Sequence, residues 1–166
     1  TTTTISKAYD PTDSSYNMAS GSISADFSRP ITIYTSLGGP LNVNLSFVRL
    51  VSDSSESLWG VELYAPEVDG DTIIEDGLDG GNLLAYGTIS FNGDGTLRSV
   101  TGPIAASFDI NPTGLAEAVT TTINFGTDDT LDDMTSFASA SKATSLTQNG
   151  FPTGQLQSLQ IDSEGF

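Results

Sequence analysis

The chain contains no cysteine and no histidine among its 166 residues. Without cysteine there is neither a disulfide framework nor thiolate chemistry. Without histidine the commonest general base and the commonest zinc ligand are both missing. Serine is abundant, but no Gly-x-Ser-x-Gly motif occurs and no histidine could activate a serine nucleophile. We therefore expect the protein not to be an enzyme.

Basic residues are also scarce, since five lysines and arginines face 21 aspartates and glutamates and give a formal net charge of −16. An acidic chain of this kind repels nucleic-acid phosphates and anionic membrane surfaces. No apolar run approaches the length of a membrane span, and no signal peptide is visible. We expect neither nucleic acid nor membrane as a partner, and we interpret the charge as a solvated surface that keeps an exported protein soluble.

Long amphipathic helices are missing as well, and the patterns present are those of β-strands. The clearest pattern is a hairpin. Residues 31–34 are rich in β-branched side chains, residues 36–40 form a glycine-containing turn, and apolar and polar side chains alternate over residues 41–47. The same alternation over residues 59–63 predicts a third strand, with Glu62 on the outer face.

The second half of the chain repeats these signals. Residues 86–91 predict a strand, and the Asn-Gly-Asp-Gly sequence within residues 92–97 predicts a hairpin turn. Alternation over residues 104–110 and a β-rich run over residues 120–125 predict further strands, while acidic residues 128–134 could cap one short helical turn. The sequence therefore predicts an all-β fold, an antiparallel β-sandwich or open β-barrel built from hairpins with little helix.

Three acidic segments are candidates for chemistry: residues 69–76, residues 92–95 and residues 128–133. Calcium takes about six to eight oxygen ligands, and neither of the first two segments has the spacing of a known calcium loop. Paired carboxylates in catalysis need an enclosing scaffold, which a polar linker around residues 128–133 does not offer. We expect solvated turns, and so no catalytic, cofactor-binding or metal-binding residue, no cofactor and no small-molecule substrate; a calcium site in residues 69–76 stays the alternative.

The end of the chain reads as a turn over residues 147–154, a short apolar strand over residues 156–161 and a second reversal at residues 162–165. A reversal needs a returning strand, and the chain stops one residue later. We expect the sequence to be a piece of a longer protein.

Several of these segments resemble the bacterial flagellar hook protein family, in the same order along the chain. The first is similar to the family's Val-Thr-Val-Tyr-Asp-Ser-x-Gly-Asn hairpin, with Thr35 and Gly39 as departures that remain compatible with a turn. The matching segments are residues 31–39 (ITIYTSLGG), 45–49 (LSFVR), 58–64 (LWGVELY), 88–97 (TISFNGDGTL) and 149–156 (NGFPTGQL).

The resemblance implies the outer domain of a hook subunit, a structural protein of the extracellular flagellum. It implies an inner-domain strand remnant and linker at residues 1–10, an outer β-domain at residues 11–140 with an acidic loop insertion at residues 66–82, and a return segment at residues 141–166. Full-length copies would self-associate into a flexible curved tube that transmits torque from motor to filament. The fragment alone is expected to be a monomer.

A second class of function stays open at this point. An extracellular β-domain that binds a ligand, such as a carbohydrate-binding module or an adhesin, would use an exposed aromatic platform, for which Trp59 and Tyr64 are the candidates. Burial of Trp59 in the core would favour the hook interpretation. The sequence also does not separate a hook protein from a related rod or cap component.

Overall fold

The structure is a computed structural model that describes residues 3–4, 8–52, 56–66, 78, 81–112, 117–131, 134–136, 142 and 145–154. These residues form strands joined mainly by turns, with one short 3-10 turn, η1. The elements are β1 (Thr3–Thr4), β2 (Phe27–Tyr34), β3 (Pro40–Ser52), β4 (Glu56–Tyr64), β5 (Leu83–Asn92), β6 (Leu97–Thr101), η1 (Pro103–Ala105), β7 (Phe108–Ile110) and β8 (Val119–Thr121).

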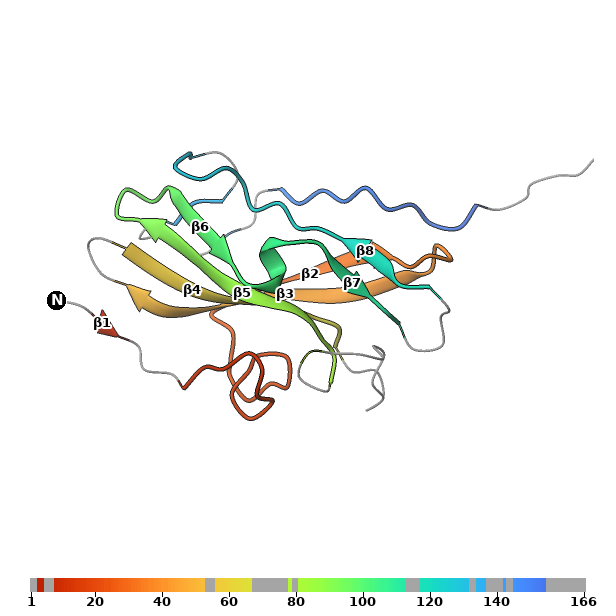
Figure 1. Ribbon diagram of the computed structural model, residues 1–166, viewed down its shortest axis with the longest axis horizontal. Coiled ribbons are helices and arrows are strands. Elements are labelled where there is room, and N and C mark those ends of the chain that lie inside the picture. The colour runs from red at the N-terminus through yellow and green to blue at the C-terminus, as the bar shows by residue number, and fades with distance from the viewer. Residues whose placement is uncertain are drawn as a thin grey trace, which may run out of the picture.

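The main sheet is antiparallel and six-stranded, in the order β1-β3-β4-β5-β6, and β2 pairs with the same long strand β3 (Figure 1). Strands β7 and β8 form a separate two-stranded sheet. The prediction of an antiparallel all-β fold is confirmed. In the described part of the chain the outer strands of the main sheet do not pair with each other, so the sheet is not closed into a barrel.

The predicted hairpins are present. Strands β2 and β3 pair from Tyr34 opposite Pro40 to Phe27 opposite Phe47. The turn between β5 and β6 is closed by the Asn92 N–H, which donates to the Thr96 carbonyl at 2.9 Å. Strand β4 pairs with both β3 and β5, so it lies near the centre of the sheet. Local alternation and turn chemistry were sufficient to predict these elements because each forms between neighbours in sequence.

The strand predicted over residues 104–110 is wrong in its first half. There the chain forms η1, and β7 begins only at Phe108. Gly102 adopts φ 91°, and the chain crosses β5 so closely that a Cβ on Gly87 would lie 2.1 Å from the Thr101 carbonyl oxygen. The crossing places Ile104 in the core without a strand, and this explains why its apolar spacing resembled alternation.

Two shorter predictions are corrected in the same region. Only the start of the predicted run over residues 120–125 belongs to a strand, because β8 ends at Thr121. In the described part of the acidic segment, residues 128–131 form a turn and not a helical turn, since Asp129 adopts φ 59°. Its N–H donates to the Leu97 carbonyl at 2.6 Å, which ties this turn to the start of β6.

The hydrophobic core lies on one face of the main sheet. Alternate side chains of β3, β4 and β5 point to this face, and residues from η1, β7 and the segment after β8 cover it. Burying a side chain of this kind contributes about 1.5–3 kcal/mol, so this face supplies most of the folding free energy. Its fully buried members include Val43, Val61, Ile89, Leu97, Ile104 and Ile110.

The other face of the sheet is covered by residues 8–26, which we call the strap. Figure 1 shows the strap on one side of the sheet and β7 and β8 on the other. Met18 of the strap is buried, as are Val48 and Leu83 of the sheet, and none of the three belongs to the core. The prediction that Glu62 faces outward is wrong, because the strap covers it and it is fully buried.

The first and last described segments lie at opposite ends of β3. Strand β1 pairs with Val51 and Ser52, whereas the Thr153 N–H donates to the Gly38 carbonyl at 3.2 Å, just before β3 begins. The turn predicted at residues 149–150 is wrong, since residues 145–154 run without a turn. The predicted strand at residues 156–161, the reversal at residues 162–165 and most of the acidic loop fall outside the described residues.

Candidate functional site

The acidic candidates that the structure describes do not converge. Among the residues that the structure describes, no three Asp, Glu, His or Cys side chains lie close enough to hold a metal ion. The Asp94 carboxylate instead accepts the Thr96 N–H at 3.0 Å and the Thr96 hydroxyl at 2.7 Å. These hydrogen bonds hold the pKa of Asp94 below its ordinary value, as expected for a carboxylate within a tight turn. Residues 69–76 lie outside the described part of the chain.

Within the acidic segment 128–133, the described residue Asp129 makes a hydrogen bond to another segment. The Asn92 side-chain amide donates to Asp129 at 3.0 Å and to the Thr96 hydroxyl at 2.9 Å. This network joins the acidic turn to the β5–β6 hairpin. Asp128 and Asp129 are exposed, while Asp132 and Asp133 lie outside the described residues. The arrangement supplies hydrogen bonds between segments and offers no enclosure to a reacting group.

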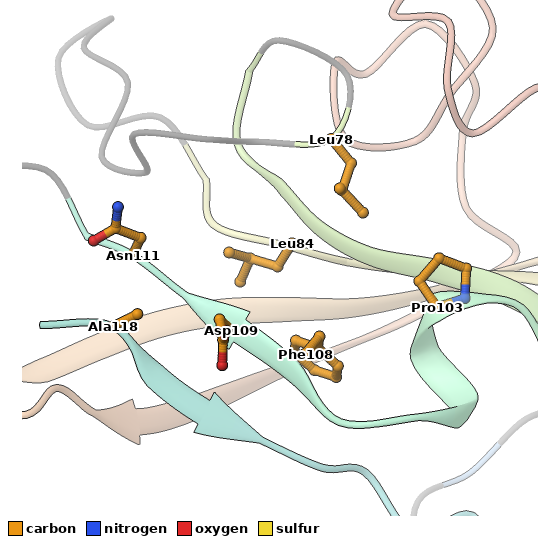
Figure 2. Close-up of a pocket in the computed structure, with 7 residues that line it drawn as sticks. All are labelled: Leu78, Leu84, Pro103, Phe108, Asp109, Asn111 and Ala118. Carbon is orange, nitrogen blue, oxygen red and sulfur yellow. The ribbon is translucent and has the colours of Figure 1, made fainter.

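One surface hollow, with a volume of ≈ 360 Å³, lies between the start of β5 and the β7–β8 sheet. Figure 2 shows its lining, which is mainly apolar: Leu78, Leu84, Pro103, Phe108, Asp109, Asn111 and Ala118. Its single acidic side chain, Asp109, accepts the Thr120 hydroxyl at 2.6 Å, so it also joins β7 to β8. The described lining holds one carboxylate and no histidine, so it offers no acid–base pair.

Trp59 is the only tryptophan, and it is 9% exposed within the core. The guanidinium carbon of Arg49 lies 4.8 Å from the ring centroid, and the indole N–H donates to the Ser57 hydroxyl at 3.3 Å. The cation covers one ring face, and the core surrounds the rest of the side chain. A stacking platform for a sugar needs an open ring face, so the structure does not favour the carbohydrate-binding alternative.

The most unusual polar group is Glu62, which lies on the strap side of β4 with no exposed surface. The Met18 N–H donates to both carboxylate oxygens, at 3.1 Å and 3.0 Å, and the Ala19 N–H donates to Oε2 at 2.8 Å. Hydrogen bonds to an ionised group are the stronger kind in proteins. We call this contact the Glu62 latch, because it joins the strap to the sheet across 44 positions of sequence.

Tyr9 completes the contact between strap and sheet. Its ring lies over Gly60, where a Cβ would come within 2.6 Å of the ring carbon Cε1. Gly60 is therefore required for the close approach of the ring. Burial raises the pKa of the Tyr9 hydroxyl above its ordinary value of 10.0, and the adjacent Glu62 carboxylate raises it further. Burial and the Glu62 carboxylate thus make ionisation of the Tyr9 hydroxyl unfavourable.

The strap contains hydrogen bonds between its own residues. Asn17, which is fully buried, accepts the Ser20 N–H on its side-chain oxygen at 2.9 Å and the Ile23 N–H on its carbonyl at 2.9 Å. Its side-chain amide donates to the Pro11 carbonyl at 3.3 Å. These hydrogen bonds connect residues within the strap and give it a compact shape.

The strap is fixed where it joins β2. The Asp26 N–H donates to the Phe47 carbonyl at 2.8 Å, and the Asp26 carboxylate accepts the Arg49 N–H at 2.8 Å. Both bonds connect the residue just before β2 to β3. Asp26 thus connects the end of the strap to β3. The Glu62 latch is a separate contact, made by Met18 and Ala19 earlier in the strap.

Sequence reasoning missed Glu62 and Tyr9. Alternation correctly removes Glu62 from the core face, but it does not reveal that another segment covers the opposite face. One signal was available: Gly60 and Glu62 are neighbours on the same face of a strand, and glycine in a strand interior often marks the close approach of another segment.

Comparison with known proteins identifies the family. The family described as "Flagellar basal body protein FlaE D2 domain" matches residues 3–151. The match spans nearly the whole chain, including the strap, both hairpins and the β7–β8 sheet. The chain belongs to this family, in agreement with the resemblance of the hairpin segments to flagellar hook proteins.

Curated relatives support the same assignment. Two proteins called flagellar hook protein FlgE, from two strains of Helicobacter pylori, are each 25% identical to this chain over 135 residues. The aligned region is 81% of this chain and 18% of each relative, so the chain spans about a fifth of their length. No solved structure matches the chain. No helix in the described part of the chain is long and apolar enough to cross a membrane.

Proposed function

We propose that this chain is the outer β-domain of a flagellar hook subunit, a structural protein without enzymatic activity. The main support is the family match over residues 3–151, together with relatives that are named hook proteins. Full-length copies polymerise into a flexible curved tube outside the cell that transmits torque from motor to filament. In this proposal residues 1–10 and 141–166 connect the domain at residues 11–140 to an inner domain.

The described surface suits contacts that shift. Its exposed large apolar side chains are Tyr16, Leu37, Leu78, Leu131, Leu146 and Phe151, which come from the strap, the β2–β3 turn and several loops. A surface of this composition makes wet contacts that exchange easily, because polar groups at an interface retain bridging water. A broad apolar interface would instead fix neighbouring copies in one arrangement as the tube bends.

Immunoelectron microscopy tests the location. An antibody raised against the 166-residue chain should label the hook segment of intact flagella from the source bacterium. A strain that lacks the full-length gene should show no label and no hook. Labelling confined to the rod or cap would contradict the hook assignment, and surface labelling away from flagella would favour an adhesin.

The oligomeric state of the isolated chain is a separate expectation. Light scattering at micromolar concentration should give the monomer mass of 17.3 kDa. The reason is that the strongest apolar surface of the domain is already used in its own core. A stable dimer or larger species would show that this domain contributes an interface of its own.

A further inference from the structure

We propose that the strap is a releasable cap, held on the sheet by the Glu62 latch, which opens and closes as a unit while the core stays folded. The proposal is independent of the proposed hook function, because it concerns contacts within one chain. Among the described residues, the strap face buries few apolar side chains. Its contacts with the middle of the sheet there include the Glu62 hydrogen bonds and the Tyr9 ring over Gly60.

The docked and released states of the strap differ little in free energy. Burying a carboxylate sacrifices its hydration, and the hydrogen bonds from Met18 and Ala19 exceed that loss by only a small margin. Release returns the Glu62 carboxylate and the Met18 and Ala19 N–H groups to water. The free energy of docking is then a small difference between two large terms, unlike the burial of the core on the other face.

The construction of the strap allows it to move without unfolding. The hydrogen bonds around Asn17 lie within the strap and survive its release. Asp26 anchors the strap to β3 and provides the pivot. At the other end, β1 pairs with only Val51 and Ser52, a short ladder that adds little resistance.

The core is insulated from this motion. The core cluster and the partly buried apolar residues packed against it include no strap residue. The main ladders β3–β4 and β4–β5 do not include strap residues. Opening of the strap therefore exposes Glu62, Met18 and Val48 while it leaves the ladders intact.

Thiol labelling measures the opening directly, since the chain has no cysteine of its own. In a Met18→Cys variant the thiol replaces a side chain that is 3% exposed, so its labelling rate reports the open fraction of the strap. Adding Glu62→Gln should raise the labelling rate on the order of tenfold, because hydrogen bonds to a charged group are replaced by weaker ones. Trp59 fluorescence should remain that of the folded core.

Glu56→Gln is the matched control, since Glu56 lies on the same strand but is 43% exposed and pairs with Arg98 at 2.8 Å. It should leave the labelling rate unchanged. Gly60→Ala is a second test, because its added Cβ displaces the Tyr9 ring without altering any charge; it should also accelerate labelling. If Glu62→Gln does not fold, the Gly60→Ala result decides.

Two outcomes overturn the proposal. In the first, neither variant accelerates labelling beyond the Glu56→Gln control, so the latch does not hold the strap. In the second, labelling accelerates only in proportion to global unfolding measured by Trp59 fluorescence, so the strap has no motion of its own. Acceleration of labelling in a chain whose core is unchanged supports the proposal.

Discussion

The two faces of the main sheet are built from the same three strands but by different means. One face buries apolar side chains of β3, β4 and β5 against η1, β7 and the segment after β8. The other face buries Asn17, Ser46 and Glu62, which are the three fully buried polar residues in the described part of the chain. The strap that covers this face is held by hydrogen bonds to a carboxylate.

Because the two faces are held by different interactions, one side of the sheet can be rigid while the other is movable. Apolar burial is non-directional and tolerates no opening without a loss of free energy in proportion to area. A buried carboxylate is directional, and its own hydration compensates for much of what is lost when the contact opens. In a protein proposed to work in a bending tube, such a division would let one segment move while the domain keeps its shape.

A substitution on the apolar face should lower the free energy of unfolding the most. Ile89 is fully buried and lies opposite Trp59 and Val100 in the ladders. Ile89→Ala should lower the free energy of unfolding by about 3 kcal/mol, the sum of lost burial and a cavity. Urea denaturation followed by Trp59 fluorescence measures this change. A loss below about 1 kcal/mol would mean that the core does not dominate stability.

A pair of glycine variants compares the faces directly. Gly87→Ala places its Cβ against a main-chain oxygen, which cannot move without shifting the crossing at Gly102, so we expect a loss of about 2 kcal/mol in unfolding free energy. The nearest atoms to the Cβ of Gly60→Ala belong to the Tyr9 side chain, which can shift, so the global loss should be about 1 kcal/mol or less. Urea denaturation of both variants measures the ranking, and the reverse order would contradict the two-face account.

Alkaline pH should release the strap selectively. The pKa of Tyr9 is raised above 10.0 in the docked state, so a released strap loses this proton at lower pH than a docked one. Docking is therefore fully favourable below pH 10 and weakens as the pH rises beyond it. Fluorescence anisotropy of a dye on Ser15→Cys should fall above pH 10.

The control for this titration is Tyr9→Phe, which keeps the ring over Gly60 but removes the ionisable hydroxyl. In this background the fall of anisotropy above pH 10 should disappear or move to the pH at which the whole domain unfolds. An identical titration with and without the Tyr9 hydroxyl would assign the effect to other tyrosines.

The smallest effect should come from the exposed ion pair on β4. Glu56 and Arg98 are 43% and 55% exposed, and water screens the pair. Glu56→Gln should change the free energy of unfolding by about 0.5 kcal/mol or less, and added salt should remove even that. A thermal melt at low and high salt measures it, and a large change would show that surface charge matters more than either face.

The sequence predicted the elements whose information is local. The hairpins of β2–β3 and β5–β6 and the strand β4 follow from alternation and turn residues within a few positions of each other. The crossing at Gly102 was missed because it depends on Gly87, a contact between segments that alternation does not encode. Where the structure describes them, the acidic residues within 92–95 and Asp129 make hydrogen bonds within or between turns.

The latch was missed for the same physical reason. Period-two alternation assigns Glu62 to the polar face, and a carboxylate on a polar face is normally hydrated. Its burial depends on Met18 and Ala19, more than 40 positions away, and on the folded shape of the strap. Contacts of this range are decided by tertiary packing and leave no periodic signal.

Native-state hydrogen exchange of the unmodified chain in low urea tests the central claim most directly. The amides of Met18 and Ala19 should exchange by an opening with little urea dependence, since it exposes little surface. The ladder amides of Val61 and Ile89 should exchange only with the steep dependence of global unfolding. Equal opening free energies and equal slopes for the two sets would mean that both faces open together, and the account of a rigid and a movable side would fail.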